Sequence, residues 1–472
     1  MTALAPAPGA RHGVAPPPAA SSSADRRRRR AARRDGWRDT LEATAWLAGT
    51  GAVALALASG TLDVTTPAGT LITLGRLTGM AASTLILTQL VLIARIPAVE
   101  RAVGHDRAAR VHGRLGRLGF LVILAHAALL IAGYAMSAGA GVLDQTWQFV
   151  VGYGTPMLLA SVGLLVLIAV VVTSYAAVRR RWQYETWHAV HVFSYLAVGL
   201  SVPHQLTDGS TFRAMGFAWW YWVVLWSVAA GGLLVFRVGR PLARHLRHRL
   251  TVAFVDPLPD GSTVIAMRGR RLGALHARPG QFLLFRFLER DIWGQAHPYS
   301  LSRAPREEWL RITVKPLGDH SARLASIRPG TRVMVEGPLG TFTDRERAGG
   351  PVVLAGAGIG IAPIVAMLDG AELERGRCTV IVRASSAADA PHLDEVMAFA
   401  EQRGFAVHVL LGPRGDGWTP AAQPVRLRDL VPDLADADVY ACGPEPWVGA
   451  LLDEAEQEGV PRDRLHTEAF AW

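Results

Sequence analysis

Five histidines lie on two apolar segments of this sequence, where polar side chains are rare. His112 and His126 are 14 residues apart on the first segment. His191 and His204 are 13 residues apart on the second segment. At a helical rise of ~1.5 Å per residue, both spacings separate the two rings by roughly 20 Å along the helix axis. Because imidazole is the commonest protein ligand of metal ions, the segments predict two metal sites at two depths, each with one imidazole from each segment.

Six uncharged stretches are long enough to cross a membrane, for which about 20 apolar residues suffice. The histidine segments are the third and fifth of these stretches, and no stretch of this length follows Arg237. We therefore predict an all-α six-helix membrane bundle over residues 41–240, preceded by a basic, disordered tail over residues 1–40. The predicted spans are residues 43–62, 77–94, 118–143, 145–178, 186–207 and 214–236.

The arginines between these spans indicate which side of the membrane each loop occupies. The loops after the second and fourth spans and the segment after the sixth span are arginine-rich, whereas the loops after the first and third spans have no Lys or Arg apart from Arg76, which borders the second span. Basic loops stay in the cytoplasm. We therefore expect a multi-pass protein of the cell membrane, in contact with the lipid bilayer, whose N-terminus and second half are cytoplasmic. The net charge of +10 then reflects topology, and no nucleic-acid partner is expected.

Two imidazoles from different helices at the same depth are what a haem iron with two histidine ligands requires. Given this topology, we expect His112 and His191 to hold the haem nearer the cytoplasm. His126 and His204 would hold the outer haem, so the prediction is two b-type haems. His188 is an alternative to His191, because it lies about one helical turn away. Hydrogen-bonded packing of each histidine is the alternative to ligation.

The second half of the sequence has the patterns of a soluble protein with two domains. Short alternating strands bounded by turn residues predict a small antiparallel β-barrel over residues 245–346. Strand and helix patterns alternate over residues 350–472, which predicts an α/β doubly wound domain that binds a nucleotide. The two cysteines are too few for a disulfide scaffold or a four-cysteine metal site.

A glycine-rich turn over residues 356–363 follows the first strand of the doubly wound domain. Such glycines let a phosphate approach backbone N–H groups at a helix N-terminus, although a simple tight turn is the alternative. At the end of the next strand, Arg383 stands where an acidic residue would bind a ribose 2′-hydroxyl, and it therefore favours NADPH over NADH. The residues assigned to this nucleotide site are Gly356, Gly358, Gly360, Pro363, Arg383 and Ser385.

Further motifs complete the pattern of a known family: His297-Pro298-Tyr299-Ser300-Leu301-Ser302, then Lys315 with Gly318-Asp319-His320-Ser321, and Cys442-Gly443-Pro444. Over about residues 40–472 the chain resembles the ferric reductase and NADPH oxidase superfamily. In that family a ferric-reductase transmembrane domain is fused to a ferredoxin–NADP reductase module that binds FAD. The resemblance implies that residues 297–302 are the flavin motif, with Tyr299 against the isoalloxazine and Ser300 near its N5 atom. It also implies that Lys315, Gly318, His320 and Ser321 contact the flavin pyrophosphate.

The resemblance implies catalytic roles as well. The cysteine of Cys442-Gly443-Pro444 is expected beside the nicotinamide. Trp472, in preference to Phe470, is expected to cover the flavin until the nicotinamide displaces it. Arg76 matches an arginine of the oxidase branch near the outer haem and the oxygen-reducing site, with snorkelling to the membrane surface as the alternative. Leu130 stands where the oxidases have a second histidine near the outer haem. This difference argues against a protein dedicated to producing superoxide, so ferric iron is an expected acceptor as well as oxygen.

These features predict a transmembrane oxidoreductase. Cytoplasmic NAD(P)H would pass a hydride to FAD, and single electrons would cross through the two haems to oxygen, giving superoxide, or to a ferric chelate outside. Two alternatives stay open. One is an electron-relay subunit that reduces a separate partner protein on the outer face. The other is a six-helix transporter with a nucleotide-sensing domain, which requires no haem.

Overall fold

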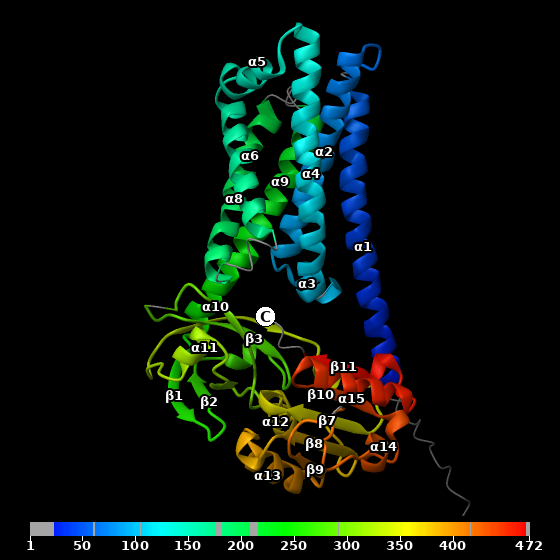
Figure 1. Ribbon diagram of the computed structural model, residues 1–472, viewed down its shortest axis with the longest axis vertical. Helices are drawn as coiled ribbons and strands as arrows, with labels where there is room; N and C mark the ends of the chain where they lie inside the picture. Colours follow the sequence, from blue (N-terminus) through cyan, green and yellow to red (C-terminus); the bar gives the residue numbers. More distant parts are fainter. Residues whose placement is uncertain are drawn as a thin grey trace, which may run out of the picture.

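The computed structural model describes residues 23–59, 62–103, 105–175, 182, 184–207, 216–290, 292–415 and 417–468. Long helices fill one half of the elongated molecule, and sheets with shorter helices fill the other half (Figure 1). The helical half ends with His248, and the first strand begins at Thr251. The chain therefore has the predicted order, in which a helical half precedes an α/β half.

The helical half consists mostly of long apolar helices. These are α1 (Ser23–Ala58), α2 (Pro67–Ile93), α4 (His105–Ala138), α6 (Thr155–Ser174), α8 (Tyr184–Thr207) and α9 (Phe217–Gly232). Shorter helices are α3 (Pro97–Val103), α5 (Val142–Trp147), the π-helical η1 (Gln148–Gly152) and η2 (Leu233–Gly239), and α10 (Arg240–His248). Five segments of the described chain have the length and apolarity of a membrane span: Gly36–Ala58, Pro67–Ile93, Arg107–Ala138, Thr155–Ser174 and Phe217–His248.

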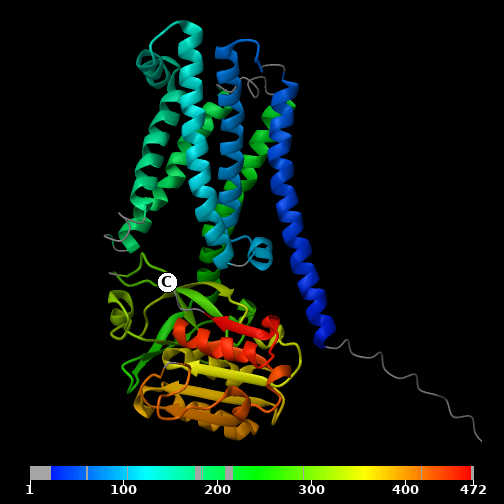
Figure 2. The ribbon, with the colours of Figure 1, turned by 45° about the vertical axis from the view of Figure 1, so that its right-hand side comes forward.

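The remaining predicted span, residues 186–207, falls on α8. This segment is helical as expected, but its three histidines and other polar side chains make it less apolar than the five spans. α8 lies along α6 inside the helical half, as both views show (Figures 1 and 2). Five of the six predicted spans therefore correspond to helices of sufficient length and apolarity, and a membrane crossing by α8 stays a prediction.

One predicted span boundary was wrong for a local reason. The second span begins as α2 at Pro67, ten residues before the expected start, because Arg76 lies within the helix and does not end it. Residues 145–178, predicted to hold the fourth span with room for a loop around Trp147 to Pro156, are divided there into α5, the π-helical η1 and α6. Pro156 lies in the first turn of α6, where a missing N–H is tolerated.

The α/β half begins with two antiparallel sheets of three strands each. β1 (Thr251–Pro257), β2 (Thr263–Arg268) and β5 (Trp309–Val314) form the first sheet, in the order β1-β2-β5. β3 (Phe282–Phe287), β4 (His297–Ser300) and β6 (Val333–Leu339) form the second, in the order β4-β3-β6, and α11 (Asp319–Leu324) follows β5. Isolated bridges, Thr251 with Arg332 and Leu301 with Ile312, connect the two sheets. A closed barrel is therefore not confirmed, because only single bridges join the sheets.

The rest of the α/β half is a five-stranded parallel sheet covered by helices on both faces. Its strands are β7 (Val352–Ala357), β8 (Cys378–Ala384), β9 (Ala406–Leu411), β10 (Asp438–Cys442) and β11 (Leu465–Glu468), in the order β11-β10-β7-β8-β9. α12 (Ile361–Gly370) and α13 (Leu393–Arg403) pack on one face, and α14 (Leu427–Leu430) and α15 (Glu445–Gln457) pack on the other. This is the doubly wound arrangement that the alternating pattern predicted.

Two of the polar contacts between the helical half and the α/β half lie on β6. Arg95, just after α2, forms an ion pair of 2.6 Å with Glu336 on β6. Arg244 of α10 donates a hydrogen bond to the carbonyl oxygen of Gly337 on the same strand. Because β6 pairs with β3 and β3 pairs with β4, these contacts connect the membrane helices to the strand that begins the predicted flavin motif.

Asp438 is a buried carboxylate on which the start of β10 depends. It is 0% exposed and accepts hydrogen bonds from Ala348 N at 2.8 Å and from His466 Nε2 at 3.0 Å. Asp438→Ala leaves these donors without an acceptor, so we expect the unfolding free energy to fall by about 2–4 kcal/mol. Thermal unfolding followed by tryptophan fluorescence measures the change. Asp433→Ala, at an exposed carboxylate, is the control, and an equal midpoint for both variants would contradict this role.

Candidate functional site

A cavity of about 520 Å³ lies among the long helices of the membrane half. This volume is in the range of cofactor and ligand sites. His126 of α4 and His204 of α8 both line the cavity, and so does the predicted Arg76. The structure therefore brings the two histidines predicted for the outer site to one cavity.

The orientation of His126 follows from its contact with α2. Its Nδ1 atom lies 2.6 Å from the carbonyl oxygen of Gly75. A carbonyl oxygen only accepts, so Nδ1 carries the proton and the Nε2 lone pair remains available for a metal. A Cβ atom on Gly79 would lie 2.6 Å from His126 Cε1, so glycine at this position makes room for the ring. A histidine that binds a metal through Nε2 typically donates such a hydrogen bond from its other ring nitrogen, Nδ1.

His112 and His191 face one another, with ring centroids 6.1 Å apart and planes at 84°. Trp187 stacks on His191 at 5.1 Å. Ser174 donates its hydroxyl proton to Val170 O, so its oxygen accepts from Trp187 Nε1 at 3.1 Å and from His191 Nδ1 at 3.4 Å. The structure thus brings together His112 and His191, the two rings that the sequence predicted for one site.

The separation of the His112 and His191 rings fits the requirements of haem iron. Two iron–imidazole bonds of ~2 Å, with ~1 Å from each nitrogen to its ring centre, place ring centroids roughly 6 Å apart, as observed for His112 and His191. In the part of the chain that the structure describes, no three or more His, Cys, Asp or Glu side chains gather as a metal site. Pairs are sufficient for haem, since the porphyrin supplies the other four ligands. Buried Nδ1 atoms of His112 and His204 have no hydrogen-bond partner among the described residues.

Two features of the cavity were missed by sequence reasoning. Gln205 Oε1 accepts hydrogen bonds from Ser83 Oγ at 3.1 Å, Trp222 Nε1 at 3.0 Å and Trp226 Nε1 at 3.3 Å. This amide fixes the helical turn that contains His204 to α2 and α9. A glutamine next to a histidine in an apolar segment was the available signal, because polar residues at membrane depth are costly unless they are bonded.

The second missed feature is an aromatic group beside Arg76. Arg76 Nη2 lies 3.4 Å from the hydroxyl of Tyr134. The Tyr134 ring meets Phe149 edge-on at 5.6 Å, and Phe149 stacks on Tyr153 at 5.1 Å. Phe149 lies in the π-helical η1, an element often found at functional sites. All four side chains line the same cavity, and Leu130 lines it too.

The predicted flavin site contains buried polar atoms of Ser300 and His320 that have no hydrogen-bond partner among the described residues. His297 stacks on His320 with ring centroids 3.9 Å apart. Both ring nitrogens of His320 and the hydroxyl of Ser300 are buried without a hydrogen-bond partner among the described residues. Burial raises the pKa of Tyr299, so its phenol stays protonated. Unsatisfied polar atoms beside an aromatic ring fit a cradle for FAD, whose phosphates and ring nitrogens would satisfy them.

Other residues of the flavin motifs take supporting positions. Leu301 and Ser302 are fully buried, so their side chains stabilise the strand end. Ser321 Oγ accepts from Leu317 N at 2.9 Å and from Gly318 N at 3.0 Å, which closes the turn before α11. Lys315 is half-buried at the end of β5. Pro298 pairs with Leu284 within the sheet.

The glycine turn and the cysteine motif meet at the ends of neighbouring strands. Gly356 on β7 is the register partner of Cys442 on β10. A Cβ atom on Gly360 would clash with the carbonyl oxygen of Cys442, so only glycine allows this approach. Cys442 is 0% exposed, and burial raises the pKa of its thiol well above the usual range. Gly443 and Pro444 connect this cysteine to α15. In the same way, Gly358 lies in the turn before α12, and Pro363 lies in the first turn of α12.

Arg383 ends β8 in a largely buried position. It donates hydrogen bonds to the carbonyl oxygens of Ala384 and, at 3.1 Å, Pro413. Burial lowers the pKa of its guanidinium. Ser385, which follows, is exposed. Trp472 and Phe470 lie outside the described residues, which end at Glu468.

Comparison with known proteins assigns each half of the chain. A family model described as "Ferric reductase like transmembrane component" matches residues 78–202. This range contains His112, His126 and His191, and His204 lies two residues beyond it. The second half is similar in sequence to reductase proteins. The flavohemoprotein of Chromobacterium violaceum is 35% identical over 220 residues, which are 42% of this chain and 54% of the relative.

Two further similarities are of the same kind. The "3-ketosteroid-9-alpha-monooxygenase, ferredoxin reductase component" of Mycolicibacterium smegmatis is 31% identical, over 46% of this chain and 61% of the relative. Among solved structures, the flavohem-like FAD/NAD binding domain of nitric oxide dioxygenase from Vibrio cholerae has a TM-score of 0.40 and 24% identity, over 47% of this chain and 98% of that one. The chain spans about half the length of the curated flavohemoproteins it matches. A region that matches the ferric-reductase-like transmembrane component is thus followed by a region similar in sequence to ferredoxin-reductase-type proteins, in the order that its motifs indicated.

The His297–His320 stack predicts a pH effect on stability. Burial, together with the neighbouring His297, lowers the pKa of His320 from 6.5 to about 4 in the folded protein. The unfolded chain therefore binds this proton first, and stability is lost as the pH falls from about 6.5 to 4. Without cofactor, the thermal unfolding midpoint of the His320→Gln variant should fall less between pH 7 and pH 5 than the midpoint of the wild type. The exposed His276→Asn is the control, and identical slopes for His320→Gln and wild type would contradict this linkage.

Proposed function

We propose that this chain is a transmembrane oxidoreductase that passes electrons from NAD(P)H through FAD and two b-type haems to an acceptor on the opposite face. The observation that carries the proposal is the arrangement of two histidine pairs on α4 and α8, attached to a reductase module. His112 and His191 form one pair, and His126 and His204 line one cavity. Two haems would use these paired imidazoles as iron ligands, whereas a nucleotide-regulated transporter requires no haem.

The nucleotide site and the flavin site would together carry out the first step, the transfer of a hydride from NAD(P)H to FAD. Backbone N–H groups of the Gly356–Gly360 turn would bind the pyrophosphate of NAD(P)H at the N-terminus of α12. The buried thiol of Cys442 stays neutral and uncharged beside the nicotinamide, because its pKa is raised. Ser300 offers an unpartnered hydroxyl to the flavin edge. FAD, when bound, accepts a hydride and releases its two electrons one at a time.

The histidine pairs divide the membrane crossing into shorter distances. The hydrocarbon core is ~30 Å thick, and the rings of His112 and His126 are separated by ~21 Å along their helix. His112 and His191 would serve the site nearer the reductase module, and His126 and His204 the site farther from it. Haem, when bound, supplies an iron that takes up and releases single electrons.

The far end of the pathway would receive an acceptor beside Arg76. Arg76 and the hydroxyl of Tyr134 are the polar groups that meet there, at 3.4 Å. A guanidinium attracts superoxide and anionic ferric chelates alike, so oxygen and ferric chelate are the two proposed acceptors. By the positive-inside pattern of the loops, the reductase module would face the cytoplasm of a cell membrane.

The histidine pairs predict the haem stoichiometry of variants. We expect two b-type haems per chain in the wild type, and one in His126→Ala and in His191→Ala, because each variant removes one iron ligand. The measurement is the pyridine haemochrome spectrum per mole of purified protein. His188→Ala is the matched control on the same helix and should retain two haems. A wild-type protein without haem would contradict the proposal and favour the transporter.

The acceptor is tested with the reconstituted wild-type protein. Oxidation of NADPH, followed by its absorbance, is measured with oxygen, ferric citrate or a quinone as the added acceptor. We expect turnover with oxygen or ferric citrate, and a loss of that turnover in Arg76→Met. Haem reduction by NADPH without turnover on any small acceptor would instead indicate delivery to a separate partner protein.

Arg383 predicts a preference for NADPH. A charge-assisted hydrogen bond to the 2′-phosphate contributes ~1.5–3 kcal/mol, so Arg383→Ala should raise the KM for NADPH by roughly 10-fold or more. The KM for NADH should change little, because NADH has no 2′-phosphate. Steady-state kinetics with both nucleotides measure this difference, with the exposed Arg375→Ala as the control. An equal effect on both nucleotides would show that Arg383 serves the fold through Ala384 O and Pro413 O.

A further inference from the structure

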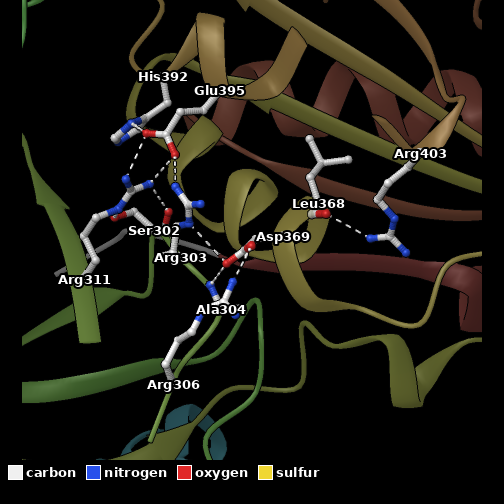
Figure 3. Close-up of polar contacts among 10 residues, drawn as sticks. All are labelled: Ser302, Arg303, Ala304, Arg306, Arg311, Leu368, Asp369, His392, Glu395 and Arg403. Carbon is white, nitrogen blue, oxygen red and sulfur yellow. Dashed lines mark hydrogen bonds and ion pairs between the residues drawn. The ribbon is translucent and has the colours of Figure 1, made fainter. Parts of the chain in front are cut away.

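Five charged side chains form an ion cluster across the interface of the two reductase domains (Figure 3). Arg303, Arg306 and Arg311 come from the domain of β1–β6, and Asp369 and Glu395 come from the doubly wound domain. The contacts are Arg303 Nε to Asp369 at 3.2 Å, Arg303 Nη1 to Glu395 at 2.8 Å, Arg306 Nη2 to Asp369 at 3.0 Å, and Arg311 Nη1 and Nη2 to Glu395 at 2.9 and 3.0 Å. We call this set the interdomain ion cluster.

The cluster is a built site, unlike a set of surface ion pairs. The side chain of Asp369 is 4% exposed and that of Arg311 is 16% exposed. Asp369 also accepts from the backbone N–H of Ala304 at 3.0 Å. Burial alone would raise the pKa of Glu395, yet hydrogen bonds from His392 and Arg311 lower it to about 2. Glu395 is therefore charged at neutral pH, and both carboxylates accept hydrogen bonds from arginines of the other domain.

One side of the cluster is attached to the flavin motif. Arg311 Nη2 donates to the carbonyl oxygen of Ser302 at 2.6 Å, and its Nε atom donates to Ser302 Oγ at 3.3 Å. Ser302 is the last residue of that motif, and Arg303 is the next residue along the chain. Thr313, two residues after Arg311 on β5, bonds His392 Nε2 at 2.7 Å. The end of the flavin motif is thus tied to the N-terminus of α13.

The other side of the cluster is attached to the nucleotide turn. Asp369 lies at the end of α12, the helix that begins directly after Gly360. A helix of ten residues is a stiff rod of ~15 Å, so the position of Asp369 determines the position of the glycine turn at the other end. Gly370 closes the interface, because a Cβ there would lie 2.5 Å from Ala304 Cβ and 3.1 Å from Pro279 Cγ.

We propose that the interdomain ion cluster positions the nicotinamide against the flavin for hydride transfer. The proposal rests on the proposed function, in which the C4–H bond of the reduced nicotinamide breaks and its hydride, with both electrons, moves to flavin N5. The nicotinamide is thereby oxidised and the flavin reduced. Reacting atoms must lie ~3–3.5 Å apart, and a displacement of ~1 Å slows such a step by about 100-fold. Domain interfaces within one chain move readily, so a charged cluster at this interface restricts the displacement.

The experiment is anaerobic stopped-flow reduction of the flavin by NADPH in the purified full-length protein. Glu395→Gln and Asp369→Asn remove the negative charges. Gly370→Val leaves every charge in place and wedges the domains apart. In each variant we expect the rate at saturating NADPH to fall at least 10-fold, while bound FAD and the apparent Kd for NADPH stay within about threefold. The matched control is Arg268→Met, which breaks the ion pair of Arg268 with Glu308 inside one domain.

Several readouts separate positioning from loss of fold. A positioning defect leaves hydride transfer as the slow step, so 4-deuterated NADPH should give an undiminished isotope effect in the variants. Arg306→Met removes only an exposed donor to Asp369 and provides a milder variant if Asp369→Asn does not fold. Flavin reduction within twofold of wild type in Glu395→Gln or in Gly370→Val would overturn the proposal. Wild-type flavin that neither NADPH nor NADH reduces would instead overturn the proposed function.

Discussion

Imidazole rings placed among apolar helices are the feature to which the rest of this structure is adapted. A polar ring at membrane depth is costly unless its nitrogens find partners. His126 Nδ1 bonds Gly75 O, and His191 Nδ1 lies 3.4 Å from Ser174 Oγ. The surrounding helices satisfy this requirement: Gly79 makes room for His126, and Gln205 holds the turn beside His204 to α2 and α9.

The reductase module is attached to these helices through a short series of contacts. Arg95 and Arg244 bind neighbouring residues of β6, and that strand belongs to the same sheet as the first residues of the flavin motif. The end of the motif continues into Ser302, which the interdomain ion cluster connects to α12 and its glycine turn. Each predicted cofactor position is therefore related to the next one through β-strands, a stiff helix and the contacts of arginine side chains.

Sequence reasoning succeeded where local physics was sufficient. Uncharged length identified five spans, and alternation identified the strands and the doubly wound domain. It was wrong at Arg76, which lies inside α2 where a span boundary was predicted. The barrel stays a prediction, because single bridges join the two three-stranded sheets. His188 and His191 were alternatives because both share one helix, and the structure places the His191 ring opposite His112. Tyr134 and Phe149 were missed, since nothing local in the sequence places them at the cavity.

The sequence by itself determined the depths of the histidines, because the rise of a helix is nearly constant. It also determined the glycine turn before α12 and the family resemblance, since these depend on residues close together in the chain. Only the tertiary structure decided which rings face one another and which charges meet. Arg303 and Asp369 are 66 residues apart, and Arg311 and Glu395 are 84 apart. Such partners are chosen by how whole helices and strands pack, and no local spacing contains that information.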